Sequence, residues 1–346
     1  MDQEQFLALA VVDWQARHGR HDLPWQNTRD PYRVWLSEIM LQQTQVVTVL
    51  DYFSRFLVRF PDVVALARAS LDEVLSLWSG LGYYSRARNL HLCAQQVTTH
   101  HAGVFPQTAR ELQSLPGIGP STAAAIASLC FLERVAILDG NVKRVLTRFL
   151  GFEADLSQAA NERILWQRAN ALLPAEACSQ HMPGYTQGMM DLGATLCTSR
   201  KPACEKCPLQ LRCMAFEAGN PLKYPVKTRR IKRGSQALWL LWAQSADGAV
   251  WLSQRPAPGV WAGLYCFGVF DSYQELQQSL PQHMELKRVE MPSFKHVLTH
   301  KDLFLHPVQV TLPAATSPGA PGAWYEPMQW QNLGLPAPVR KLLRDG

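Results

Sequence analysis

Apolar residues in the first two thirds of the chain recur three and four positions apart. This spacing predicts a mostly helical region from residue 1 to about 215. One long helix is expected at about Tyr32 to Phe56, where Glu38 shares a stripe with the apolar residues Val34 and Leu41. A further helix should begin at the capping box formed by Thr108 and Glu111 and end at Pro116-Gly117.

The pattern changes beyond a proline-containing and charged stretch near residue 225. Strand-like segments follow at 238–243, 250–254, 264–270 and 303–312, with an Asp247-Gly248 turn and a terminal helix at 338–344. We therefore expect a multi-domain chain: a mostly α region at 1–225, a basic linker at 226–236 and an α/β domain at 237–346.

Composition agrees with an ordinary globular protein, since 47% of the 346 residues are hydrophobic and 18% are charged. The longest apolar runs are far shorter than the ~18 residues of a membrane span, which predicts no membrane segment. Asp2 and Glu4 stand where a secretory signal would be basic and then apolar. We expect a cytoplasmic protein.

Positive charge is concentrated in one segment. Residues 200–233 hold ten Lys and Arg against two Glu, a net +8 in a chain whose total is +6. Such a cluster is either a solvated linker or the binding surface for a polyanion.

Four of the eight cysteines form one cluster with six, two and five residues between successive members: Cys197, Cys204, Cys207 and Cys213. One close pair flanked by two single cysteines favours a single [4Fe-4S] cluster over zinc, which usually takes two close pairs. The remaining cysteines should be buried apolar thiols: Cys93, Cys130, Cys178 and Cys266. Thiolate ligation requires a reducing compartment.

A glycine turn stands between two predicted helices. Gly117 and Gly119 allow a tight turn whose amides can approach a phosphate, next to the N-terminus of a small-residue helix at 122–132. Leu-Pro-Gly-Ile-Gly between two helices is typical of a helix-hairpin-helix motif that contacts the DNA backbone. A plain interhelical turn is the alternative.

Two carboxylates are candidates for acid and base chemistry. Glu38 lies on a half-apolar stripe, so partial desolvation should raise its pKa and let it hold a proton near neutral pH. Asp139 precedes a helix and should be an ionised N-cap. A protonated Glu beside an ionised Asp suits glycosidic bond cleavage, whereas a solvated Glu and a purely structural cap are the alternatives.

Together the hairpin, Leu138-Asp139-Gly140-Asn141-Val142 and the cysteine spacing resemble the endonuclease III-like DNA glycosylases. Residues 35–45 and 80–88 and the C-terminal domain resemble the adenine-specific branch, and the likeness covers essentially the whole chain. The resemblance implies a monomer that removes adenine opposite 8-oxoguanine or guanine from double-stranded DNA. It also implies two helical lobes with DNA between them: a hairpin lobe near 25–135 and a cluster lobe made of the N-terminus and 136–225.

By the same resemblance, Glu38 protonates the adenine and Asp139 stabilises or bonds the sugar. Asn141 helps to hold the sugar and the water. Gln43 and Tyr83 fill the gap left when the base leaves the stack.

Glycosylases of this group that also cut the strand have a lysine where this chain has Ser121. The absence of that amine predicts a mainly monofunctional enzyme whose nucleophile is water. Ser121 is also expected at the DNA contact of the hairpin. Lys143 is near enough to Asp139 in sequence to contact DNA and to trap an opened sugar adventitiously.

The C-terminal domain resembles the Nudix fold but lacks its glutamate-rich helix, so no magnesium-dependent nucleotide hydrolysis is expected. The resemblance implies that residues 294–300 read the 8-oxoguanine strand through Thr299 and His300. Leu298 stands where family members often have Phe. His296 and His300 could instead be ordinary polar strand residues.

Three other functions are open. They are an oxidised-pyrimidine glycosylase with lyase activity, an electron-transfer protein and a non-enzymatic DNA-binding module. Ser121 and the second domain count against the first, and a basic, hairpin-containing setting counts against the second.

Overall fold

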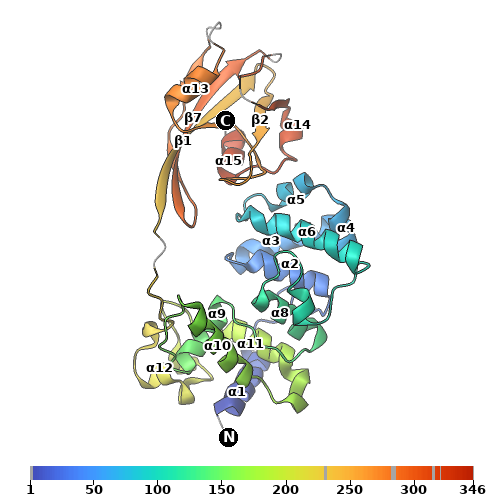
Figure 1. Cartoon of the computed structure of the whole chain (residues 1–346), viewed down its shortest axis with the longest axis vertical. Coiled ribbons are helices and arrows are strands. Elements are labelled where there is room, and N and C mark those ends of the chain that lie inside the picture. The colour runs from blue at the N-terminus through green and yellow to red at the C-terminus, as the bar shows by residue number, and fades with distance from the viewer. Residues whose placement is uncertain (1–2, 230–231, 282–285, 314–315, 320, 346) are drawn as a thin grey trace. The chain divides into compact units, whose positions relative to one another are not determined.

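The computed structural model describes residues 3–229, 232–281, 286–313, 316–319 and 321–345, apart from the side chains of residues 3, 4 and 176–178. The chain forms two compact units (Figure 1). Unit 1 comprises Met1–Ala67 and Leu92–Arg230, and unit 2 comprises Arg68–His91 and Ile231–Gly346. The division falls within helix α4, Val63–Arg68, and within helix α6, Tyr84–His100.

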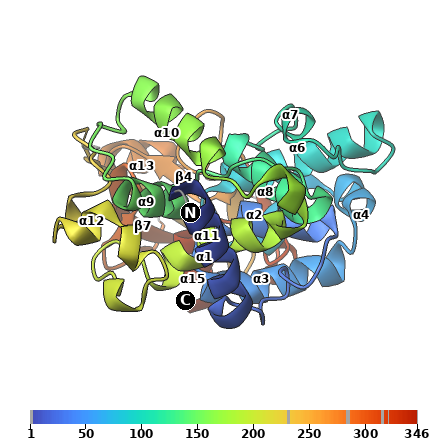
Figure 2. The ribbon, with the colours of Figure 1, turned by 90° about the horizontal axis from the view of Figure 1, so that it is seen from below.

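Unit 1 is helical. Helix α11, Met182–Thr195, packs against α1 (Gln3–His18), α8 (Pro120–Phe131) and α9 (Gly140–Phe149), and Figure 2 shows α1 beside α11. These helices surround one apolar core. The other helices are α2 Pro31–Leu41, α3 Val46–Arg59, α4 Val63–Arg68, α7 Ala109–Leu112, α10 Ala159–Ala171 and α12 Met214–Glu217, with 3-10 turns η1 Glu176–His181, η2 Cys204–Lys206, η3 Gln210–Arg212 and η4 Pro221–Lys223.

The single long helix expected at 32–56 is wrong. The structure has α2 and α3 separated by the polar residues 42–45. Gln43 has a φ of 58°, a left-handed conformation that an α-helix does not accommodate, and Gln45 is the N-cap of α3. The apolar spacing continues across the turn, and therefore the pattern does not reveal the break.

The helix expected to run from Thr108 to Pro116 is also shorter than predicted, since α7 ends at Leu112. The Thr108 hydroxyl accepts a hydrogen bond from the Glu111 amide at 3.3 Å, as a cap should. The Glu111 carboxylate accepts a hydrogen bond from that same hydroxyl at 2.7 Å. The two residues are therefore also joined by a bond between their side chains.

Unit 2 is the expected mixed α/β fold. Its central strands β1 (Gly234–Ser245) and β7 (Lys301–Leu312) are parallel, and the other pairings are antiparallel. The remaining strands are β2 Val250–Gln254, β3 Tyr265–Cys266, β4 Gly268–Phe270, β5 Arg288–Glu290, β6 Phe294–Val297 and β8 Ala323–Tyr325, and the helices are α5 Leu71–Trp78, α13 Tyr273–Ser279, α14 Pro327–Trp330 and α15 Ala337–Asp345.

The strand expected at 264–270 is two short strands. Because β3 pairs with β2 whereas β4 pairs with β1, the chain changes neighbours near Phe267. Cys93, Cys130 and Cys266 are buried as predicted, and the side chain of Cys178 lies outside the described residues. Among the described residues, no helix is long and apolar enough to cross a membrane.

Candidate active site and cysteine cluster

The fold brings the two candidate carboxylates of unit 1 together. Glu38 lies on α2, which packs against α8, and the segment after α8 leads to Asp139. Glu38 is half-buried. Withdrawal from water and, as the smaller cause, the negative charge of Asp139 together raise the pKa of its carboxyl to about 7. Glu38 can therefore hold a proton near neutral pH.

Asp139 is the N-cap of α9. Its Oδ1 accepts a hydrogen bond from the Val142 amide at 2.7 Å, and its Oδ2 accepts from Asn141 Nδ2 at 3.4 Å. The predicted cap is thus present, and it fixes the direction of the carboxylate. Because an N-terminal helix dipole favours a negative charge, capping and service as a catalytic anion are compatible.

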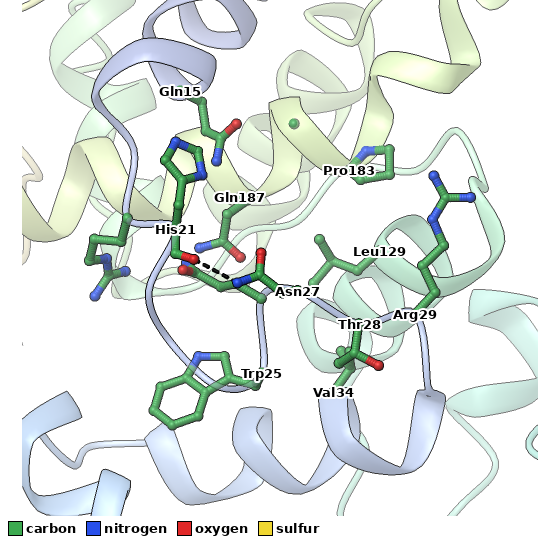
Figure 3. Close-up of a pocket in the computed structure, with 13 residues that line it drawn as sticks. Gln15, His21, Trp25, Asn27, Thr28, Arg29, Val34, Leu129, Pro183 and Gln187 are labelled. Carbon is green, nitrogen blue, oxygen red and sulfur yellow. Dashed lines mark hydrogen bonds between the residues drawn. The ribbon is translucent and has the colours of Figure 1, made fainter.

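Unit 1 also has a cavity of about 380 Å³ (Figure 3), which neither carboxylate lines. Val34, which lies one helical turn before Glu38, contributes to the wall, as do Trp25, Leu129 and Pro183. Amide side chains of Asn27 and Gln187 are drawn around the same space, and Asn27 Nδ2 donates to the His21 carbonyl at 2.7 Å. Most of the lining side chains are polar, and they include the guanidinium groups of Arg20 and Arg29.

Gln26 also lines this cavity, and sequence reasoning did not find it. Its side-chain oxygen and nitrogen are both buried, and neither has a hydrogen-bond partner among the described residues. A buried amide without partners is unfavourable by about 1–3 kcal/mol for each unsatisfied group. Nothing in the pattern around Gln26 marks it, because the cavity is assembled from distant segments.

Another contact missed by the sequence analysis holds the loop before α2. Asp191 on α11 is completely buried, and it accepts hydrogen bonds from Arg20 Nε at 2.7 Å and from the Arg20 amide at 3.0 Å. Arg20 lines the cavity as well. This ion pair ties the cavity wall to α11.

The glycine hairpin has the predicted geometry. Gly117 has a φ of 76°, and Gly119 is the N-cap of α8 with open space where a Cβ would stand. The Ser121 hydroxyl accepts from the Leu138 amide at 3.1 Å, so this side chain connects α8 to the segment that carries Asp139.

Lys143 lies one turn after Asp139 on α9. Its Nζ is 2.6 Å from Glu162 Oε1 on α10. The side chain is mostly buried, with 22% exposed.

The four clustered cysteines line one pocket of unit 1 and form no disulfide. Three of them pack against the helical core. Among the described residues, no three His, Cys, Asp or Glu side chains form a group that could hold a metal ion. The four predicted ligands nevertheless line the same pocket.

Two arginines of α9 join this pocket to the carboxylate site, and neither was predicted. Arg148 is buried and its Nη1 donates to Cys197 Sγ at 3.3 Å and to the Thr198 carbonyl at 2.7 Å. Arg144 donates to the Cys197 carbonyl and to Asn141 Oδ1, at 2.7 and 2.8 Å. Arg144 thus connects Asn141, which donates to Asp139, with Cys197, a predicted ligand of the cluster.

The candidates for filling a DNA gap share an uncommon backbone conformation. Gln43 in unit 1 and Tyr83 in unit 2 have φ angles of 58° and 48°. Both side chains are exposed. A left-handed non-glycine residue at an exposed turn is a recognised feature of functional sites.

In unit 2, Tyr83 meets the predicted lesion-reading turn. Tyr83 Oη and Thr299 Oγ1 are 2.5 Å apart, and both residues line a cavity of about 440 Å³ together with His300. Thr299 and His300 lie in the exposed turn between β6 and β7, whereas His296 is a half-buried β6 residue whose pKa is lowered by burial.

Comparison with known proteins gives two family matches. Residues 36–171 match the HhH-GPD superfamily of base excision DNA repair proteins, and residues 239–345 match the NUDIX domain. An adenine DNA glycosylase of Buchnera aphidicola is 37% identical over 340 residues, which cover 97% of this chain and 96% of the relative.

Two solved structures of DNA glycosylase folds are similar to the helical part of this chain. A thermostable thymine-DNA glycosylase is 28% identical, with a TM-score of 0.54 over 62% of this chain and 97% of its own. Endonuclease III in a non-covalent complex with DNA has a TM-score of 0.51 over 63% of this chain and 99% of its own; at 20% identity it shows the fold alone.

Proposed function

Because the chain belongs to the adenine DNA glycosylases, base excision repair enzymes that bind DNA and hydrolyse N-glycosidic bonds, we propose that it removes adenine paired with 8-oxoguanine or guanine. The observation that carries this proposal is the pairing of a carboxyl group with a pKa of about 7, Glu38, and an oriented carboxylate, Asp139. A carboxyl group that can hold a proton, together with an oriented carboxylate, is what glycosidic bond cleavage requires.

In the proposed reaction, Glu38 transfers its proton to adenine N7 as the bond between adenine and C1′ breaks, so that the base leaves neutral. Asp139 stabilises the positive charge that develops on the sugar. Water then adds to C1′ and gives up a proton to the Glu38 carboxylate, which restores the acid. Asn141, fixed by Arg144, holds the sugar and this water.

The adenine must leave the duplex to reach Glu38. The cavity lined by Val34, on the helix that carries Glu38, supports this step, because the Gln26 side-chain oxygen at its wall can accept a hydrogen bond from the adenine amino group at N6 and leaves N7 to Glu38. Gln43 and Tyr83 fill the gap in the duplex. Gly117, Gly119, Ser121 and Lys143 hold the DNA backbone.

The strand opposite the adenine is read in unit 2. Thr299 and His300 contact 8-oxoguanine from the β6–β7 turn, where the Tyr83 hydroxyl lies within hydrogen-bond distance of the Thr299 hydroxyl.

The proposal includes monofunctional action, a monomeric enzyme and a cytoplasmic location at the chromosomal DNA. It keeps the division into catalytic region 1–225, linker 226–236 and Nudix-like domain 237–346.

A [4Fe-4S] cluster held by Cys197, Cys204, Cys207 and Cys213 is also part of the proposal. Two observations support the fit: the four thiols line one pocket, and Arg148 supplies positive charge and a hydrogen bond at Cys197 Sγ. Bound there, the cluster would shape the basic loop at 200–212 against DNA phosphates.

A single-turnover assay tests the function. Matched duplexes carry adenine opposite 8-oxoguanine, guanine or thymine, and each reaction is quenched with and without hot alkali. Alkali-dependent breaks at adenine in the first two duplexes are expected, and none opposite thymine. Breaks without alkali would contradict monofunctional action, and equal cleavage of all three duplexes would contradict mispair recognition.

A further inference from the structure

The loop that carries Tyr83 is attached at both ends to a segment near the C-terminus of unit 2. The hydroxyl groups of Ser79 and Tyr84 donate hydrogen bonds to the same acceptor, the Leu335 carbonyl, at 2.9 and 3.0 Å. Leu335 is completely buried. The loop between Ser79 and Tyr84 therefore starts and finishes at one fixed point between α14 and α15.

Arg340, on α15, holds the same end of the loop. Its Nε donates to the Ser79 hydroxyl at 2.9 Å. Its Nη2 and Nη1 donate to the carbonyls of Leu333 at 2.7 Å and Gln331 at 3.1 Å. Because a guanidinium group presents its donors in one rigid plane, Arg340 fixes Ser79 relative to the chain between α14 and α15.

This chain segment is itself fixed to the sheet and to α5. The Gly334 carbonyl accepts a hydrogen bond from the Tyr265 amide of β3 at 2.9 Å. A Cβ added to Gly334 would lie 2.6 Å from Leu75 Cβ, so the segment lies against α5 without room for a side chain. The contacts of Arg340 therefore connect the loop to a rigid part of unit 2.

The loop needs such support because its backbone is unusual. Gly80, Gly82 and Tyr83 have φ angles of 105°, 72° and 48°. A non-glycine residue in this region persists only where its surroundings hold it. Trp78 Nε1 and Arg86 Nη2 donate to the Gly82 carbonyl, at 3.0 and 3.3 Å, and hold the middle of the loop.

The loop and the predicted reading turn face one cavity. Tyr83, Thr299 and Ala337, the first residue of α15, all line the cavity of about 440 Å³. Tyr83 Oη and Thr299 Oγ1 are 2.5 Å apart. Since a hydrogen bond between hydroxyl groups is lost beyond about 3.0 Å, this contact requires the loop to stay in place relative to the turn.

We propose that Arg340 is a positioning residue that determines specificity: through Ser79 it holds Tyr83 at the reading turn, so that recognition of 8-oxoguanine assists the extrusion of adenine. The inference rests on the proposed function in the roles given there to Tyr83 and Thr299. Without the contacts of Arg340, the loop and the turn would act separately.

Single-turnover excision by the full chain tests this role. Arg340→Met removes the donors, and excision opposite 8-oxoguanine should fall about tenfold, the scale of a lost hydrogen bond from a charged group. Excision opposite guanine should change little. Ser79→Ala should reproduce this result with a much smaller change of side chain, and Arg340→Lys should give an intermediate ratio. Arg344→Met, at an exposed position of the same helix, is the matched control and should leave both rates unchanged.

A double-mutant cycle separates this role from a general loss of structure. Tyr83→Phe retains the ring but removes the hydroxyl that meets Thr299. Arg340→Met should therefore cause little further loss when it is added to Tyr83→Phe. An unchanged ratio of excision in both Arg340→Met and Ser79→Ala, or a loss that is fully additive with Tyr83→Phe, would overturn the proposal.

Amide hydrogen exchange without DNA tests the contacts independently of excision. Arg340→Met should speed exchange at Leu81 and Arg86, whose amides donate to the Trp78 and Tyr83 carbonyls, and should leave α8 of unit 1 unchanged. Unchanged exchange in the loop would contradict the proposal. Faster exchange in a chain whose unmodified form releases no adenine would support the positioning and contradict the proposed function. Adenine release with an unchanged ratio in the variants would do the opposite.

Discussion

Glu38→Gln should inactivate the enzyme and stabilise the protein at alkaline pH. Glutamine has nearly the shape of the protonated acid, so packing against α8 is retained, but it has no proton to donate. Loss of a general acid lowers a rate by about 10²–10⁴-fold. The gain in stability follows from the raised pKa of Glu38.

The magnitude comes from the change in that pKa on folding, from the ordinary value of 4.5 to about 7. At ~1.36 kcal/mol per pH unit, this difference corresponds to about 3 kcal/mol. Between these two pH values the folded protein binds a proton that the unfolded chain has lost. The free energy of unfolding therefore falls as pH rises through this window, and the loss is complete above about pH 7.

Urea unfolding of the variant and the unmodified protein at pH 5 and pH 8 measures this effect. Glu38→Gln should be more stable by about 3 kcal/mol at pH 8, with most of that difference gone at pH 5. Glu217→Gln, at an exposed position of the same unit, is the control and should show no such change. In the unmodified enzyme, single-turnover excision should fall tenfold per pH unit above about pH 7.

A stability difference that is equal at both pH values would refute the reasoning about burial. An excision rate that keeps its alkaline decline in Glu38→Gln would assign the acid to another group.

Three further variants test separate contacts. Gln26→Leu should weaken binding of the extruded adenine and lower single-turnover excision at least tenfold, measured against Gln113→Leu, which alters an amide outside the cavity. Arg148→Met should reduce the iron content and the visible absorbance of purified protein, because the donor to Cys197 Sγ is lost. Thr299→Val should reduce the ratio of excision opposite 8-oxoguanine to excision opposite guanine, and an unchanged ratio would contradict the reading role of this turn.

Local signals were enough for part of the fold and the site. The Asp139 cap requires only one residue directly before a helix. The glycine hairpin requires two glycines, which tolerate unusual backbone angles, directly before the N-terminus of α8. The strand at 250–254 was predicted with its observed bounds, since it alternates and is preceded by a turn. These elements are encoded within a few neighbouring residues.

Features that depend on distant segments were not predictable. The apolar spacing of the stripe through Val34, Glu38 and Leu41 continues beyond α2, although the left-handed Gln43 follows the end of that helix. Nor could the sequence pair Lys143 with Glu162, since 19 residues separate them and only the packing of α10 on α9 joins them. The unpaired amide of Gln26 has no local signal, because its lack of partners is a property of the cavity.

The two carboxyl groups show how the fold separates identical chemistry into two roles. Asp139 sits at a helix N-terminus, where a backbone amide and the helix dipole stabilise its negative charge. Glu38 sits in the last turn of the packed helix α2, where burial opposes ionisation and the nearby anion opposes it further. The two carboxyl groups are coupled, because the negative charge of Asp139 makes the protonated form of Glu38 more favourable. Replacing Asp139 with asparagine should therefore lower the pKa of Glu38 but leave it above 4.5, since burial is the larger cause. A titration of Glu38 that does not move in that variant would show that the two groups act independently.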